Sequence, residues 1–224
     1  MFYFKINRVR LHDTQSSSLL PWANKPIINM VSFIVTQTAD TVSLDNWIKE
    51  TDTGKKKTSL NAIINNNITM IDIPDISVKY STDASITFGD TGYLLYRSET
   101  IPDDLSWVFL AIKNNDRNRI VWTEITNTIT SSETETLTQP LSVILQANPA
   151  IDLALAVTRL VAGEAAKQLS TKPDDILGSA CQSFIRQQHY PYGERSRDGI
   201  PDTTGNMLVD YSLFAYNAQQ ISSQ

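Results

Sequence analysis

Between residues 70 and 130, short segments rich in β-branched and aromatic residues alternate with residues that favour turns. Val, Ile, Tyr, Phe and Trp are enriched in strands, whereas clusters of Gly, Pro, Asn and Asp are typical of turns. The segments are MIDI, SVKYS, ASITF, GYLLYRSE, SWVFLAIK and RIVWTEIT, and the turns contain Pro74-Asp75, Gly89-Asp90-Thr91-Gly92, Pro102-Asp103 and Asn114-Asn115-Asp116. Short strands at this spacing predict an antiparallel β-sandwich.

Strands are also expected near both ends of the chain, at residues 2–11, 31–38, 176–184 and 206–214. In the first of these, the apolar alternation changes phase after Ile6, which predicts a β-bulge or a strand with both faces covered. Residues 14–30 are rich in Ser, Asn and Pro and predict a loop. In the last strand, Met207, Val209, Tyr211 and Leu213 face one way, and Asn206, Asp210 and Ser212 face the other.

The position of two strands within a sheet also follows from their side chains. Trp107 to Ile112 is apolar on both faces, which predicts a central strand. Tyr93 to Arg97 alternates less regularly and is expected nearer an edge. We therefore expect a core built from sheets. The sequence contains no internal repeat.

Helical patterns occur in two places and interrupt the β pattern. Apolar residues recur at helical spacing in residues 43–66, with a break at Gly54, and again in residues 149–168, where Asn148 and Pro149 supply an N-cap and a first-turn proline. We therefore predict a mainly β fold with inserted helices, forming one domain over residues 1–216, followed by a flexible tail at 217–224.

Composition and charge restrict the class of function. Hydrophobic residues make up 41% of the chain, charged residues 19%, and the net charge is −5. This is the composition of a globular protein, and its negative charge disfavours general binding to nucleic acids. The N-terminal segment lacks the pattern of a signal peptide, and no segment is long and apolar enough to span a bilayer. We expect a soluble, cytoplasmic protein with no transmembrane segment.

Cysteine and histidine are too few for most catalytic or zinc chemistry. The single cysteine, Cys181, excludes an internal disulfide, and the chain has no zinc-ligand spacing. Cys181 and His189 are close in sequence, which raises the possibility of a cysteine hydrolase. No helix N-terminus or positive neighbour is expected to lower the pKa of the thiol, so this is the least favoured of the alternatives. Alternation in the strand 176–184 places Cys181 on the same face as Leu177 and Ser183, and a free cysteine is expected to be a small buried thiol. Gly-rich phosphate-binding and Gly-x-Ser-x-Gly motifs are absent.

Acidic residues at the ends of two predicted strands suggest a cation site. Asp116 follows the central strand, and Asp174 and Asp175 come just before the strand that begins at Ile176. Calcium prefers carboxylate, amide and backbone oxygens, which loops of this composition supply. The alternative is that these side chains only bond the backbone of their own turns.

The same segments carry a resemblance to a known family. The chain resembles the C-two type β-sandwich, the calcium-dependent phospholipid-binding domain of synaptotagmin and protein kinase C. The resemblance lies in three segments, SWVFLAIKNNDRNR, PDDILGSACQSF and NMLVDYSLF. The resemblance implies Asp116, Asp174 and Asp175 as calcium ligands, with Asp13 contributing from an adjoining loop. It also implies contact with a membrane surface.

The stretch HYPYGERSRDGIPD, residues 189–202, is expected to form a loop of mixed charge with aromatic sides. Tyr190, Tyr192, Arg195 and Arg197 are candidate residues for binding a partner, because Tyr and Arg are favoured at interaction hot spots. The alternative is a self-contained network, in which Arg195 or Arg197 pairs with Asp198 or Asp202 and Tyr190 packs on the sandwich.

We therefore expect a non-catalytic binding module, dependent on calcium, that contacts a membrane surface or a protein partner. The alternative from another class is a metal-free structural or interaction protein that assembles through the loop or through an exposed strand edge.

Overall fold

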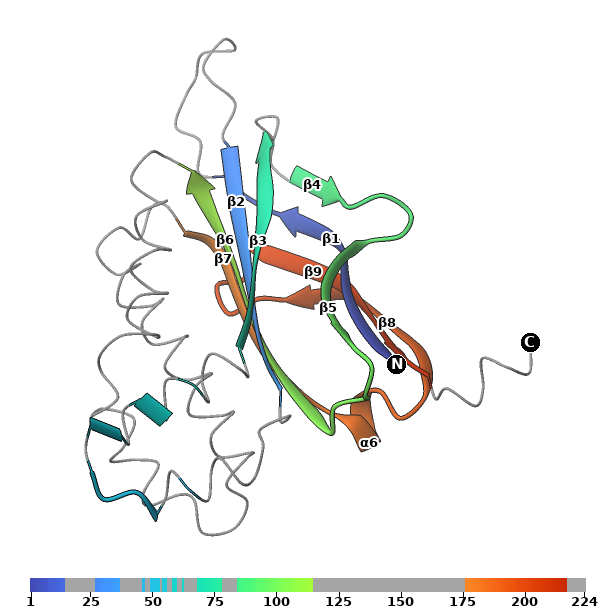
Figure 1. The fold of residues 1–224 in the computed structure, drawn as a ribbon. Coiled ribbons are helices and arrows are strands. Elements are labelled where there is room, and N and C mark those ends of the chain that lie inside the picture. The colour runs from blue at the N-terminus through green and yellow to red at the C-terminus, as the bar shows by residue number, and fades with distance from the viewer. Residues whose placement is uncertain are drawn as a thin grey trace.

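The computed structural model describes residues 1–14, 27–36, 68–77, 84–114 and 176–216, together with individual residues between 46 and 62. The described residues lie mostly in strands, and the one helix described over its full length is short (Figure 1). The strands are β1 (Phe2–Leu11), β2 (Ile27–Thr36), β3 (Ile68–Ser77), β4 (Ala84–Thr87), β5 (Tyr93–Ser98), β6 (Asp104–Asn114), β7 (Ile176–Ile185), β8 (Gly193–Pro201) and β9 (Met207–Ala215), and the helix is α6 (Arg186–His189).

The strands pair into two antiparallel sheets. Sheet A has the order β4-β1-β9-β8, with β5 paired to β1 beside β4, and sheet B has the order β3-β2-β6-β7. Figure 1 shows the two sheets as facing layers, with β1 and β9 in one and β2, β3, β6 and β7 in the other. The prediction of a mainly β, antiparallel sandwich is confirmed.

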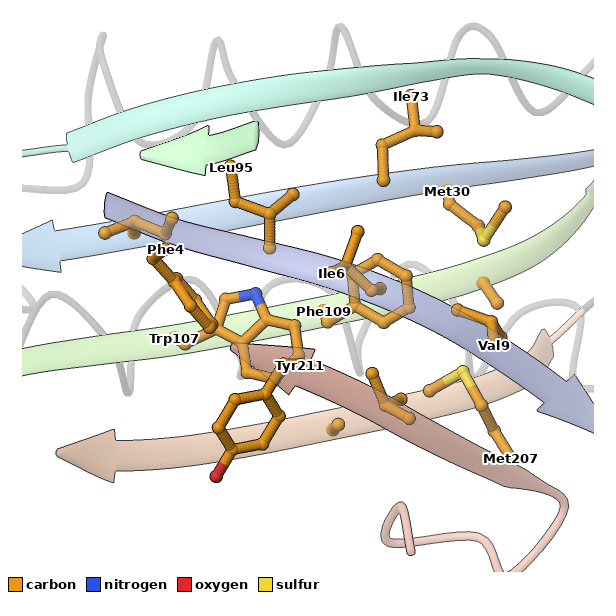
Figure 2. Close-up of a cluster of buried hydrophobic side chains, with 14 of the residues drawn as sticks. Phe4, Ile6, Val9, Met30, Ile73, Leu95, Trp107, Phe109, Met207 and Tyr211 are labelled. Carbon is orange, nitrogen blue, oxygen red and sulfur yellow. The ribbon is translucent and has the colours of Figure 1, made fainter. Parts of the chain in front are cut away.

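The core fills the space between the sheets (Figure 2). Phe4 of β1 meets the ring of Trp107 of β6 edge-on at 4.9 Å, and Tyr211 of β9 lies 5.7 Å from the same ring. The indole nitrogen of Trp107 donates a hydrogen bond of 2.9 Å to the hydroxyl of Ser32, which satisfies the one polar atom that this ring buries. Aromatic side chains from both sheets therefore hold the two layers together.

The first and last described strands, β1 and β9, pair along their full length. The register shifts between Ile6 and Arg8, so the predicted bulge is confirmed and explains the change of phase in the apolar alternation. The predicted inward face of β9 is also confirmed. Its members, Met207, Val209, Tyr211 and Leu213, are all buried in the core.

Two predictions about strand position are also confirmed. β6 pairs with β2 on one side and β7 on the other, and both Trp107 and Val108 are buried, as expected for a central strand. β5 pairs only with β1 among the described strands, which places it at an edge of sheet A.

Three predicted boundaries are wrong. β2 already begins at Ile27, inside the predicted loop, because Ile27, Ile28 and Met30 pair with both β3 and β6. β3 runs through Pro74-Asp75, where we predicted a turn; Pro is tolerated there because β3 is an edge strand and its register shifts opposite residues 28–30. The expected loop at 189–202 instead contains the last residue of α6 and the strand β8, which pairs with β9.

Of the predicted helices and the predicted tail, the structure describes only individual residues between 46 and 62. Several described residues within 46–62 have helical backbone, and the carboxylate of Asp52 accepts a hydrogen bond from the Lys55 amide in the manner of a helix cap. The predicted helix at 149–168, the segment RIVWTEIT and the tail at 217–224 lie outside the described residues. Within the described part of the chain, no helix is long and apolar enough to cross a membrane.

Candidate functional site

The one-turn helix α6 fixes the corner between sheet B and the strand β8. The imidazole Nδ1 of His189 accepts a hydrogen bond of 2.9 Å from the Ile185 amide, and the Arg186 amide donates one of 2.8 Å to the carbonyl of Asp103. The His189 ring also meets the ring of Phe184 edge-on at 5.8 Å. Backbone and ring contacts thus tie α6 to the end of β7 and to the start of β6.

Tyr190 anchors this corner in the core. Its ring is fully buried and lies 5.0 Å from the ring of Phe2. Burial raises the pKa of its hydroxyl, and the negative charges of Asp104 and Asp103 raise it further. Among the described residues this hydroxyl has no hydrogen-bond partner. Tyr190, predicted as a partner-binding residue, therefore packs on the sandwich, as the alternative interpretation of the sequence proposed.

A shallow hollow of about 270 Å³ opens outside this anchor, and its lining residues are Asp103, Arg186, Gln187, Pro191 and Tyr192. We call it the α6 hollow. The guanidinium of Arg186 lies 5.5 Å from the centre of the Tyr192 ring and donates a hydrogen bond of 3.2 Å to the Tyr192 hydroxyl. The same group pairs with the carboxylate of Asp103 at 3.5 Å. Tyr192 is 48% exposed, so its ring is held in place but available at the surface.

Asp104 lies beside the hollow at the start of β6. Its partial burial raises the pKa of its carboxyl from 3.8 to about 6, and the neighbouring charge of Asp103 adds to this effect. The corner therefore holds two adjacent carboxyl groups, of which Asp104 ionises at a higher pH than an ordinary aspartate.

The other two predicted partner-binding residues, Arg195 and Arg197, lie on β8 and are exposed. They pair in register with Leu213 and Tyr211, so their side chains lie on the inner side of sheet A. They remain outside the buried core, because β8 is an edge strand of that sheet. Neither forms an ion pair with any described residue, so the predicted pairing with Asp198 or Asp202 does not occur. Asp202 instead accepts hydrogen bonds from the amides of Ser179, Gly205 and Met207.

Of the four predicted calcium ligands, only Asp13 is among the described residues; Asp116, Asp174 and Asp175 lie outside them. The side-chain amide of Asn206 donates to the carbonyl of Asp13 at 2.8 Å and to the carbonyl of Leu177 at 2.7 Å. Within the described ranges, no group of three or more His, Cys, Asp or Glu side chains could hold a metal.

The prediction that Cys181 is buried is wrong. The register shifts where Leu177 lies opposite Ala111 and Ile112, so Leu177 turns into the core while Cys181 is exposed on the other face of β7. Desolvation raises the pKa of its thiol, whereas a nucleophilic thiolate requires a lowered pKa. The Nδ1 atom of His189 is engaged by Ile185.

Asp103, Arg186, Gln187 and Pro191 were not singled out as site residues by the sequence. Asp103 was assigned only to a turn, and Arg186 follows a predicted strand with no motif around it. For these four residues, the adjacent pair of acids at 103 and 104 is the one local signal in the sequence.

The chain was compared with known proteins by sequence and by structure. No protein-family model, no curated protein and no solved structure matches it.

Proposed function

We propose that this protein is a non-catalytic binding module that contacts a protein partner through the α6 hollow. The observation that supports this most directly is the pair formed by Tyr192 and Arg186, because an exposed aromatic ring is held against a guanidinium on a rigid support. Tyr and Arg are among the residue types that most often carry binding energy in protein interfaces. Loops and corners on a rigid sandwich are also common places for binding residues.

The support behind the hollow favours binding without rearrangement. Tyr190 is buried against Phe2, and the amide of Arg186 is bonded to the carbonyl of Asp103. A surface that is ordered before binding loses less conformational entropy when a partner arrives. The raised pKa of the Cys181 thiol and the engaged Nδ1 of His189 support binding over cysteine-dependent hydrolysis.

Site-specific photocrosslinking tests this proposal. We would replace Tyr192 by a photoreactive phenylalanine analogue and, as a matched control, place the same analogue at Tyr3 of β1. We expect a specific protein adduct from position 192 and none from position 3. The recovered partner should then bind the variants Tyr192→Ala and Arg186→Ala at least about 10-fold more weakly than the original protein. Equal affinity for all three proteins would reject the hollow as the binding surface.

A calcium-dependent mode at the opposite end of the sandwich is a second candidate. The side-chain amide of Asn206 donates to the carbonyls of Asp13 and of Leu177, at the start of β7. In the sequence, β7 directly follows Asp174 and Asp175. Its first residue, Ile176, pairs with Ile112 near the end of β6. This convergence favours a cation site of the kind that the C-two resemblance implies, with calcium linking the protein to a membrane surface.

Thermal unfolding in EDTA, calcium and magnesium separates the two candidates. Calcium at about 100 times its dissociation constant would stabilise the native state by about 2.7 kcal/mol. We expect the calcium-specific rise in Tm to disappear when Asp174 and Asp175 are both replaced by Asn. If calcium leaves the Tm of the original protein unchanged, the calcium-dependent mode is rejected and the α6 hollow is unaffected.

A further inference from the structure

The outer edges of a β-sheet carry unpaired backbone groups, and natural proteins usually block them with charges, Pro or bulges. β8, one end of sheet A, carries Glu194, Arg195, Arg197 and Asp198, and its register shifts after Arg197. β3, one end of sheet B, contains Pro74. The other end of sheet B is β7, whose ten residues, ILGSACQSFI, include no charged residue and no Pro.

The hydrogen bonds of β7 reveal which of its backbone groups face away from β6. The Ser179 amide donates to the carboxylate of Asp202, and the Ser179 carbonyl accepts from the Thr203 amide. The Ile185 amide donates to His189. In an antiparallel pair every second residue directs both its amide and its carbonyl to the same side. Because residues 179 and 185 direct these groups outward, Cys181 and Ser183 must do the same.

Both ends of this edge are closed by other parts of the chain. The turn at 202–206 covers the outward groups of Leu177 and Ser179, and α6 covers those of Ile185. Between these two closures, the amides and carbonyls of Cys181 and Ser183 form no hydrogen bond with any described residue outside β7 and β6. Both side chains are exposed, and the neighbouring Ile185 is 47% exposed. We call the edge at residues 181–183 the β7 window.

We propose that the β7 window binds a short extended segment of a partner polypeptide, which adds to sheet B as a further strand. The four outward backbone groups of Cys181 and Ser183 would pair with about three residues of the segment. The inference rests on the proposed binding function, since it specifies how a partner is held, but it uses the backbone of β7 instead of Tyr192 and Arg186.

The closures select the occupant. If a second copy paired through its own β7, the two ends of its strand would collide with the 202–206 turn and with His189. These groups already occupy the edge of β7 at Ser179 and at Ile185. A short free segment meets neither obstacle. The absence of charge along β7 and the exposed Ile185 favour a segment of uncharged, β-branched or small residues.

A peptide selection tests the proposal. The probe is a phage-displayed library of random heptapeptides, selected on the full-length protein and counter-selected on Ser183→Pro, which removes one outward amide. Ser183→Pro should keep the fold, because its amide takes no part in pairing with β6. Gln182→Pro is the matched control and should destabilise the fold, because the Gln182 amide faces β6.

We expect the enriched peptides to bind the original protein at least 10-fold more tightly than Ser183→Pro, and to bind Tyr192→Ala with unchanged affinity. We expect amide hydrogen exchange at Cys181 and Ser183 to be fast in the free protein, and the peptides should slow it. N-methylation of the peptide amides that face β7 should abolish binding, and N-methylation of the alternate amides should not, which tests the window even if Ser183→Pro fails to fold.

Three results would overturn the proposal: no enriched peptide; enriched peptides that tolerate methylation at every amide; or amides at Cys181 and Ser183 that already exchange slowly in the free protein. Protection of these amides that rises with protein concentration would identify a second copy as the occupant and would also reject a partner segment. Loss of peptide binding in Tyr192→Ala alone would assign the peptides to the α6 hollow instead.

Discussion

Asp210 is a carboxylate buried on the outer, polar face of sheet A, and its partners explain why it is tolerated there. It accepts hydrogen bonds from Arg8 at 2.6 Å, from Arg10 at 2.8 Å and from the Gly199 amide at 2.6 Å. Burial alone would raise the pKa of Asp210, but the Gly199 amide and the two arginines outweigh it and lower the pKa below 3.8. The sequence indicated which way Asp210 faces, but the burial depends on long arginine side chains from β1.

Asp210→Asn should therefore destabilise the protein by about 2 kcal/mol at pH 7, because the arginines and the Gly199 amide lose a charged acceptor. A carboxyl with a lowered folded-state pKa contributes stability above its unfolded value, and this contribution disappears as the pH falls through the folded pKa. The difference between the two proteins should shrink below about pH 4. Urea unfolding at pH 7 and pH 3 measures it, and an equal difference at both pH values would contradict the role of the charge.

Asp104 should show the opposite pH dependence. Its pKa is raised to about 6, so the folded protein holds a proton that the unfolded chain releases. Stability is therefore complete below the unfolded pKa of 3.8 and decreases as the pH rises through about 6. Asp104→Asn should match the original protein near pH 3.5 and exceed its stability by up to about 1 kcal/mol at pH 7, since the side chain remains partly exposed to solvent. Asp103→Asn, at the exposed neighbour, should reproduce only part of the gain.

At the scale of elements, strands with a regular apolar alternation were predictable and those defined by their neighbours were not. β9 and β6 were recognised because their side chains match the two faces that they present. β8 was missed because its charged residues give no apolar pattern, and its backbone pairing with β9 makes it a strand. The exposure of Cys181 was missed because a register shift at the start of β7 is invisible in the sequence. For the same reason, the closures of the β7 edge could not be anticipated.

The contact between β7 and β9 depends on the glycine at 178. A β-carbon at this position would lie 2.5 Å from the Met207 Cβ and 2.8 Å from its sulfur. Gly178→Ala should therefore destabilise the protein by about 1–3 kcal/mol through overpacking. Met207→Ala should not rescue the variant, because it retains the β-carbon that makes the closest contact. Thermal unfolding of the single and double variants measures this, and full rescue would place the conflict at the flexible end of Met207.

At the scale of the whole molecule, the two sheets should unfold together because aromatic side chains of both sheets share one cluster. Phe4 of sheet A contacts Trp107 and Phe184 of sheet B and Tyr211 of its own sheet, all with ring centres within 6 Å. β1 and β9 are also joined at their ends, where the Met1 amino group donates to the Tyr216 carbonyl at 2.6 Å. A change in this cluster should lower the protection of both layers, although the two sheets share no strand.

Phe4→Leu tests this coupling, because it keeps an apolar side chain and removes the ring contacts. We expect a loss of about 1.5–4.5 kcal/mol, at roughly 0.5–1.5 kcal/mol for each of the three aromatic pairs. Native-state hydrogen exchange should report the same loss for slowly exchanging amides of β9 in sheet A and of β6 in sheet B. Tyr3→Leu, the adjacent aromatic on the outer face of β1, is the matched control and should change stability by less than about 0.5 kcal/mol. A loss of protection confined to sheet A would mean that the sheets unfold as separate units, and that the aromatic cluster packs them together without making their stabilities interdependent.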